Sequence, residues 1–191
     1  MSNRFDFVET KISGLYVLNR LVNRDARGQF QRLFCSDELR ACGWSDPIVQ
    51  VNQTHTKTMG SIRGMHMQLA PYSEFKIVTC TRGKVFDVVL DLRPGSATFL
   101  TWVGEVLSAE DANGLVIPPG CAHGFQTLCD EVEMVYCHDR PYAPMHEFGV
   151  HAFDSRAKIS WPIEVTEMSL KDSSFPFLDE GFNGVDYART A

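Results

Sequence analysis

The chain has 191 residues, 44% of them hydrophobic and 22% charged, and a formal net charge of -6 at pH 7. This composition indicates a soluble globular protein, and the length predicts a single domain over residues 1–191. The acidic balance and the lack of a basic stripe exclude a general nucleic-acid-binding protein. Neither an apolar run of membrane-spanning length nor an N-terminal signal segment is found. We therefore expect a cytoplasmic protein with neither nucleic acid nor membrane as a partner.

The six cysteines have no C-x-x-C spacing, and a chain of this length needs no disulfide framework. They are Cys35, Cys42, Cys80, Cys121, Cys129 and Cys137. We expect free thiols in a reducing compartment. Cys80 and Cys137 fall in strand-like runs, which predicts that they are small core residues.

Short apolar segments separated by turn residues predict strands along most of the chain. The first third holds two strands within residues 4–18, a polar turn leading into a strand at 23–30, and a short helix at 36–43 with Ser36 as its N-cap. The later expected strands are 48–54, 63–68, 75–80, 84–92, 98–103, 115–117, 122–126 and 133–138. This spacing predicts an all-β sandwich or barrel. Residues 159–162 end a further strand, 168–174 form a polar loop or a helix start, and the end of the chain, about 179–191, is expected to be a mobile tail.

The stretch 63–68 carries polar side chains that alternate along a single predicted strand. In a regular strand Arg63 and Met65 face one side of the sheet, and Gly64, His66 and Gln68 face the other. A turn containing Pro71 leads into the next strand, so the hairpin brings His66 and Lys76 into one cavity. An imidazole and an ammonium group placed there can move a proton and stabilise a developing oxyanion.

The second half of the β region contains the cupin pattern G-x(3)-P-x-G-x(2)-H, which ends at His123. The stretch 63–68 lies where cupins carry their first motif, but Gln68 replaces the second histidine of that motif. Glu74 lies a residue or more away from the position of the motif's glutamate. A stable first-row metal site needs three His or carboxylate ligands, so no metal site is predicted. The alternative is that His66 and His123 are hydrogen-bonded barrel histidines.

Taken together, these stretches resemble the dTDP-4-dehydrorhamnose 3,5-epimerase family, which comprises nucleotide-sugar epimerases. The resemblance runs from about residue 9 to 178. The matching stretches are 25–30, 49–54, 63–68 with Lys76, 85–96, 118–125, Tyr136 with Tyr142, 161–162 and 169–172. The resemblance implies a cupin jelly-roll barrel with a short N-terminal helix and a less regular C-terminal tail.

The resemblance also implies the chemistry, which is inversion of C3, C5 or both in a nucleotide-linked 4-keto-6-deoxyhexose, without a cofactor. The default substrate is dTDP-4-dehydro-6-deoxy-D-glucose. His66 resembles the general base, and Asp172 the carboxylate that orients it. Lys76 would stabilise the enolate oxygen, and Tyr136 would return a proton on the opposite face. An ordinary imidazole pKa of ~6.5 and an ordinary phenol pKa of ~10 suit a base and a proton donor. From its spacing alone, Tyr136 would be interpreted as a core aromatic.

The resemblance further implies a set of side chains that contact the nucleotide or the sugar. They are Arg27, Gln50, Asn52, Arg63, Gln68, His123, Tyr142 and Asp87. Guanidinium groups bind diphosphate in a bidentate manner, whereas amides suit a base or a sugar hydroxyl. Without the resemblance, Arg27 and Arg63 would be interpreted as members of surface ion pairs.

Departures from the family pattern include Glu74, where Gln is common, and an unusual His138. The alternatives are a 3-only epimerase of the same family, a metal-dependent cupin enzyme and a non-catalytic sugar-binding cupin. The resemblance also implies a homodimer in which N-terminal strands, within 4–18 and 28–34, join the partner's sheet.

Overall fold

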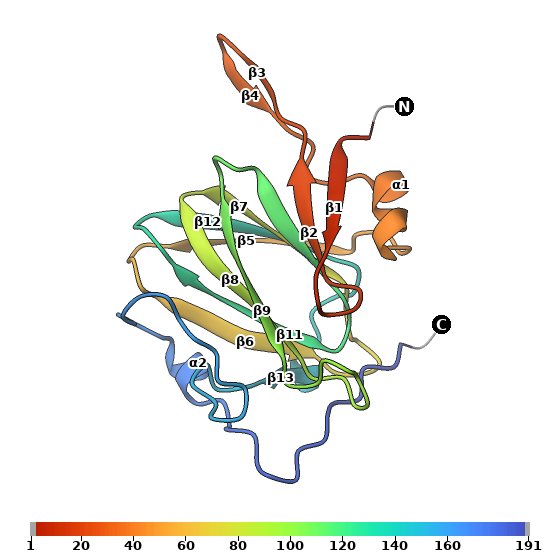
Figure 1. The fold of residues 1–191 in the computed structure, drawn as a ribbon, viewed down its shortest axis with the longest axis vertical. Coiled ribbons are helices and arrows are strands. Elements are labelled where there is room, and N and C mark those ends of the chain that lie inside the picture. The colour runs from red at the N-terminus through yellow and green to blue at the C-terminus, as the bar shows by residue number, and fades with distance from the viewer. Residues whose placement is uncertain (1–2, 190–191) are drawn as a thin grey trace.

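The computed structural model describes residues 3–189, which form two antiparallel sheets facing each other across a common core (Figure 1). One sheet has six strands, in the order β1 (Phe5–Glu9), β2 (Tyr16–Arg20), β10 (Asn113–Ile117), β7 (Lys76–Arg82), β12 (Val132–His138) and β5 (Gln50–Thr56). The other has five, in the order β13 (Glu147–Gly149), β6 (Ile62–Gln68), β11 (Cys121–Thr127), β8 (Lys84–Asp91) and β9 (Trp102–Ser108). Helical segments are short: α1 (Ser36–Leu39), η1 (Arg40–Cys42), η2 (Pro144–His146) and α2 (Leu170–Ser173). The predicted all-β jelly roll is confirmed.

Alternating apolar residues from both sheets fill the space between them. Val78 and Leu115 from the six-stranded sheet meet Val89 and Phe125 from the five-stranded sheet, and all four are buried. The outer face of the six-stranded sheet is covered by α1, η1 and Trp44, and the outer face of the other by C-terminal segments. Cys80 and Cys137 are buried as predicted, and all six thiols are free.

Three local predictions differ from the structure. The strand expected at 98–103 begins only at Trp102, because residues 98–101 form a turn in which Leu100 has a φ of 59°. No strand forms at 159–162, while the three-residue strand β13 is too short to leave a periodic signal. Helix α1 starts at Ser36, with Cys35 rather than Ser36 in the cap position and no side-chain cap.

The C-terminal segment is irregular, as predicted, but it is packed against the barrel as far as Arg189. Val185 is buried and donates its backbone N–H to Leu92 at 3.0 Å. The Arg189 guanidinium contacts the carboxylates of Asp46 and Asp139 at 2.9 and 2.5 Å. These contacts join residues far apart in the sequence, so the local pattern did not reveal them. Residues 190–191 of the expected mobile tail lie outside the described residues.

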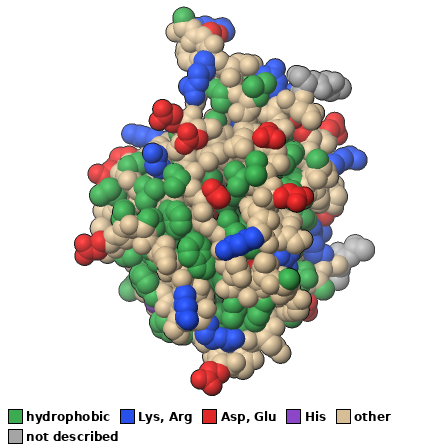
Figure 2. Space-filling view, in the orientation of Figure 1, with side chains coloured by type: hydrophobic (Ala, Val, Ile, Leu, Met, Phe, Trp, Pro, Cys, Tyr) green, Lys and Arg blue, Asp and Glu red, His purple; other side chains and the backbone are tan. Residues whose placement is uncertain are grey.

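Both N-terminal strands within residues 4–18 pair in the chain's own sheet, β1 with β2 and β2 with β10. The hairpin of β3 (Asn23–Asp25) and β4 (Gly28–Phe30) instead projects from the barrel and stands clear of its surface (Figures 1 and 2). Two segments, 4–18 and 28–34, are expected to exchange with a partner. Of these, only 28–34 does not pair with either of the chain's own two large sheets.

Two findings concern the surface of the described chain. Acidic and basic side chains are interspersed on the face shown in Figure 2 rather than gathered in a basic stripe. None of the helices within residues 3–189 has the length and apolar character needed to cross a membrane.

Candidate active site

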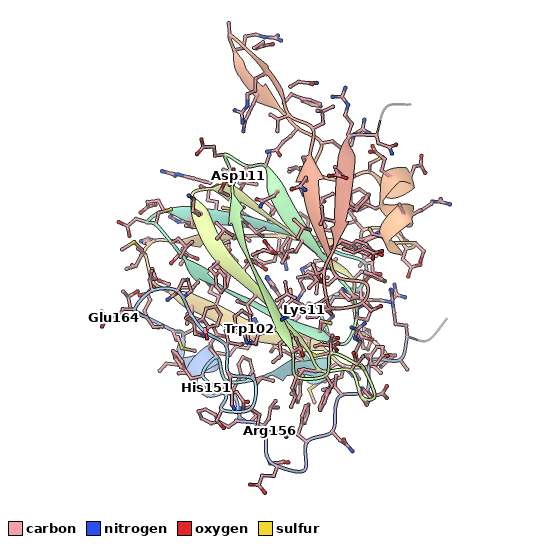
Figure 3. All side chains as sticks on the ribbon, viewed as in Figure 1. Lys11, Trp102, Asp111, His151, Arg156 and Glu164 are labelled. Carbon is pink, nitrogen blue, oxygen red and sulfur yellow. The ribbon has the colours of Figure 1, made fainter. Side chains whose placement is uncertain are left out.

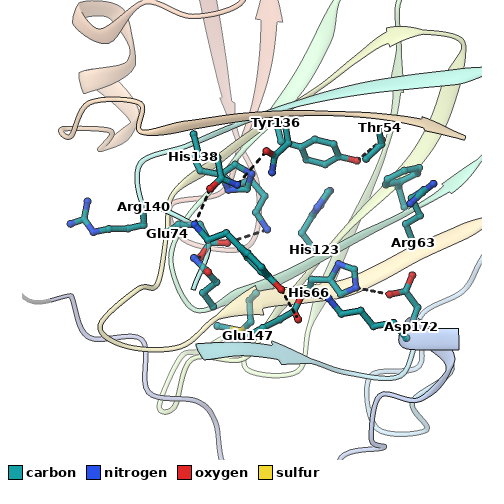
Figure 4. Close-up of a pocket in the computed structure, with 18 of the residues that line it drawn as sticks. Thr54, Arg63, His66, Glu74, His123, Tyr136, His138, Arg140, Glu147 and Asp172 are labelled. Carbon is teal, nitrogen blue, oxygen red and sulfur yellow. Dashed lines mark hydrogen bonds and ion pairs between the residues drawn. The ribbon is translucent and has the colours of Figure 1, made fainter. Parts of the chain in front are cut away.

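A cavity of about 350 Å³ opens between the two sheets and gathers most of the predicted site residues (Figure 4). This volume lies at the lower end of the range for small-ligand sites. The predicted residues that line it are Gln50, Asn52, Arg63, His66, Gln68, Lys76, His123, Tyr136, Tyr142 and Asp172. Strands β5, β7 and β12 form one wall and strands β6 and β11 the other. The cavity therefore presents chemically different groups on two facing walls.

Arg63 lies on the cavity side of β6 together with His66, which corrects the expectation that the two face opposite ways. The β6–β11 register pairs Arg63 with Phe125 and His66 with His123. Between these two pairs β6 therefore contains one residue more than β11. This bulge reverses the regular alternation and re-aims the arginine. Gly64 permits it, because a Cβ there would lie 2.5 Å from the Cα of Gly124, at a φ of +122°.

His66 and Asp172 form a dyad although they are 106 residues apart in sequence, with 2.7 Å between His66 Nε2 and Asp172 Oδ1. Helix α2 holds the aspartate, and Ser169 caps this helix by accepting a hydrogen bond from the Asp172 backbone. The preceding segment bridges to β6 at Ile62 and Met168, which brings α2 beside the histidine. Burial opposes ionisation of Asp172, but the hydrogen bonds from His66 and Ser169 dominate and lower the pKa of this carboxyl group. An ionised Asp172 fixes the orientation of the ring and stabilises an imidazolium on His66.

Tyr136 lies on β12, on the wall opposite His66, and is 9% exposed. Its hydroxyl lies 3.2 Å from Thr54 Oγ1, and its ring stands edge-on to His123 with 6.1 Å between centroids. Burial, only partly offset by the Thr54 hydrogen bond, raises the pKa of Tyr136 above its ordinary value. The phenol is therefore protonated at neutral pH and can act as a donor.

Lys76 is buried in the cavity wall, and its ammonium group lies 3.3 Å from Glu74 Oε1. Glu74 in turn accepts a hydrogen bond of 3.1 Å from the Gln68 amide. A cation held in a partly desolvated cavity acts strongly on a charge that develops beside it.

The amide of Gln68 is fully occupied by protein groups, so it braces the cavity wall instead of offering a free contact to a sugar. Besides Glu74, its nitrogen donates to the backbone oxygens of Tyr72 and Pro141, and its oxygen accepts from the Ala143 N–H at 2.6 Å. The residue thus ties the segment that carries Tyr142 to β6.

Gln68→Ala is accordingly expected to raise KM for the nucleotide sugar that the sequence predicts as substrate about 10-fold, with a smaller effect on kcat, because it frees that segment. Steady-state kinetics measure both constants. Gln53→Ala is the matched control, since Gln53 is an exposed glutamine on β5 whose side-chain amide donates a hydrogen bond to Glu133. A fall in kcat at constant KM would show instead that Gln68 acts in the transition state.

His123 and Asp87 form a second buried pair behind the cavity. Both carboxylate oxygens of Asp87 lie 2.9 Å from His123 Nε2, and Asp87 is completely buried. That burial raises the pKa of Asp87, although His123 and Lys76 oppose the shift. Only the histidine reaches the cavity, so Asp87 orients His123 and does not line the site itself.

Arg27, predicted as a nucleotide contact, is not among the residues lining this chain's cavity. It lies on the projecting β3–β4 hairpin, is 90% exposed and forms an ion pair with Asp25. The cavity instead contains two cations that the sequence analysis missed, Arg140 and Lys171. Arg140 could have been found, because the alternation of Tyr136 and His138 continues through it to Tyr142.

A second hollow, of about 800 Å³, lies beside β9 and includes Lys11, Trp102 and Arg156 (Figure 3). It contains none of the predicted site residues. Within residues 3–189, no group of three or more His, Cys, Asp or Glu side chains is placed to hold a metal ion. His66 and His123 are each hydrogen-bonded to a carboxylate instead.

A jelly-roll barrel with an imidazole–carboxylate dyad, a buried cation and a buried phenol around one cavity defines the class of cupin epimerases. The model of the dTDP-4-dehydrorhamnose 3,5-epimerase family matches residues 9–180, and the chain belongs to this family. The enzyme of that name from Shigella flexneri is 40% identical over 166 residues, which cover 86% of this chain and 91% of the relative.

Solved structures agree with this assignment. The 3,5-epimerase from Legionella pneumophila, crystallised with dTDP-4-keto-L-rhamnose, has a TM-score of 0.89 at 32% identity and covers 96% of this chain and 99% of its own. A 3'-monoepimerase from Streptomyces bikiniensis, in complex with dTDP-quinovose, has a TM-score of 0.82 at 29% identity over 88% of this chain and 85% of its own.

Proposed function

We propose that this protein inverts C3 and C5 of dTDP-4-dehydro-6-deoxy-D-glucose, without a cofactor, in a cytoplasmic pathway of deoxysugar biosynthesis. One observation carries the proposal: the His66–Asp172 dyad and the Tyr136 phenol lie on opposite walls of one cavity, with Lys76 beside them. Inversion of a carbon centre requires a proton to leave from one face and another to arrive on the opposite face.

The ketone at C4 acidifies the protons on C3 and C5, and His66 takes one of them. The electron pair moves into the C4 carbonyl to form an enolate, whose oxygen Lys76 stabilises. Tyr136 then donates its proton to the carbon from the other face. His66 then releases its proton to solvent and Tyr136 regains one, and the same sequence at the second carbon completes the double inversion.

The nucleotide portion of the substrate has suitable partners at the mouth of the cavity. Gln50 and Asn52 are hydrogen-bonded to each other at 3.2 Å, and their amides suit a pyrimidine base or a sugar hydroxyl. Arg63 is anchored by Thr56 at 2.9 Å, and with Arg140 and Lys171 it supplies positive charge for a diphosphate. Tyr142 is 51% exposed at this mouth and can cover the base.

The direct test is incubation with dTDP-4-dehydro-6-deoxy-D-glucose in deuterated water, followed by NMR. Deuterium at both C3 and C5, with both centres inverted, is the expected result. Exchange and inversion at C3 alone would identify a 3-only epimerase, like the 3'-monoepimerase from Streptomyces bikiniensis. Absence of both would leave a sugar-binding cupin. Activity lost on chelation, with stoichiometric metal in the purified protein, would indicate the metal-dependent class.

The same proposal includes a homodimer in which the β3–β4 hairpin of one copy reaches the cavity of the other. Strand β5 is a free edge of the six-stranded sheet, and its flank exposes Val49 and Val51 at 51% and 59%. Phe30 on the hairpin is 64% exposed. Pairing of the hairpin region with that edge would cover these side chains and place Arg27 beside Gln50 and Asn52.

Subunit mixing tests this arrangement. Arg27→Ala and His66→Ala are each expected to be impaired alone, whereas mixed dimers should regain activity. In a mixed dimer the Arg27→Ala subunit retains His66 and receives Arg27 from its partner. Light scattering would establish the dimer first. A monomer at micromolar concentration, or mixing without any recovery, would contradict the exchange.

A further inference from the structure

The cavity contains a third imidazole, His138, to which the mechanism assigns no part. It follows Tyr136 by two residues on β12, so both side chains face the cavity, and their rings are nearly parallel at 19° with centroids 6.4 Å apart. Because β12 lies between β7 and β5, His138 is the register partner of Lys76 on one side and of Gln50 on the other. It therefore sits between the cation assigned to the C4 oxygen and an amide at the nucleotide end.

His138 differs from the other two cavity histidines in what holds it. His66 and His123 are each hydrogen-bonded to a carboxylate, whereas the ring nitrogens of His138 form no hydrogen bond with any of residues 3–189. A half-buried polar ring that lines a cavity and has no protein partner is available to a ligand.

The surroundings also determine its charge. Burial, together with the nearby Lys76 and His123, lowers the pKa of His138 to about 3. The ring is therefore neutral at physiological pH, with one nitrogen that donates and one that accepts. A neutral imidazole is a poor partner for a diphosphate, but it matches a hydroxyl group, which both donates and accepts.

We propose that His138 is a specificity-determining residue that hydrogen-bonds the 3-hydroxyl of the sugar. The inference rests on the proposed function, in which Lys76 binds the oxygen on C4. A side chain directly beside Lys76 faces a substituent on a carbon next to C4. C5 carries a methyl group and the ring oxygen, while C3 carries a hydroxyl. The 3-hydroxyl is therefore the substituent that can hydrogen-bond to a ring nitrogen, either by donating to the unprotonated nitrogen or by accepting from the N–H.

A binding cycle that needs no turnover tests the proposal. dTDP-6-deoxy-D-glucose has a hydroxyl in place of the C4 ketone, so its C3 and C5 protons are not acidic. Its counterpart without the 3-hydroxyl differs only at the group in question. Calorimetry with wild type is expected to show about 5- to 50-fold weaker binding of the 3-deoxy compound, because an unpaired buried polar group remains.

His138→Phe keeps a planar ring but removes both nitrogens. It should bind the two compounds within about 2-fold of each other. His138→Gln, which keeps a donor and an acceptor, should restore part of the discrimination and serves if the phenylalanine variant does not fold. Equal discrimination by wild type and His138→Phe would overturn the assignment of His138 and leave the proposed function intact. Failure of wild type to bind either compound would instead overturn both.

Discussion

His66→Ala is expected to lower both hydrogen exchange and inversion by about 10²–10⁴, the usual contribution of a positioned acid or base. Without the imidazole, no positioned base on that wall removes the proton, so the enolate forms far more slowly. Asp172→Asn should also be severely impaired, because an amide can no longer hold the required tautomer or stabilise the imidazolium on His66. Deuterium incorporation by NMR and product formation measure the two steps separately.

His55→Ala is the matched control for this prediction. His55 is also a strand histidine bonded to a carboxylate, Glu131, at 2.6 Å, but the pair is solvent-exposed and lies outside the cavity. Its removal should leave the rate unchanged. If His66→Ala still exchanged deuterium at near wild-type rate, another base would have to be sought.

Tyr136→Phe is expected to separate exchange from inversion. The variant retains His66 and Lys76, so the enolate still forms, and His66 can return the proton to the face from which it came. Deuterium should therefore enter C3 or C5 with little change of configuration, while inversion falls by about 10²–10⁴. NMR reports exchange from the lost proton signals and configuration from the coupling constants. Lys76→Ala should stop both processes, because the enolate oxygen is then unsupported.

Inversion at near-normal rate by Tyr136→Phe would show that the tyrosine only packs in the wall. The nearest candidates for the donor in the sequence are His138 and Tyr142. His138, with its pKa lowered to about 3 by burial, Lys76 and His123, is not an imidazolium at neutral pH. Tyr142 would then be the first residue to mutate in the search for the donor. Its hydroxyl is hydrogen-bonded to Glu147 at 3.3 Å.

Most strands could be predicted because each one carries its own alternation of apolar and polar side chains. The run ending at His138 is an example, since its even residues face the cavity or the core of the barrel. Strand β13 and the turn at Leu100 could not be found in this way. Strand β13 is only three residues long. The turn at Leu100 depends on a positive φ at that residue, which no local sequence pattern indicated.

The site was predicted unevenly for a related reason. The hairpin alone placed His66 and Lys76 in one cavity, whereas Tyr136 and Asp172 could be named only because they match a family pattern. The distance between His66 and Asp172 in the chain gives no hint of their contact. Gln68 matches the same pattern, but its amide is occupied by backbone groups near Tyr72 and Pro141. Arg27 matches it as well, yet it lies on a hairpin outside this chain's cavity.

By itself the sequence determined the all-β architecture, the family and the side chains proposed for catalysis, because periodicity and motifs are local properties of the chain. Tertiary structure alone decided which of these side chains contact one another and which protonation state each one has. The bulge at Gly64 turned Arg63 toward His66, and the bridge between Ile62 and Met168 brought Asp172 to His66. Burial between two facing sheets then kept Tyr136 protonated and His138 neutral, because a desolvated site disfavours the charged form of either group.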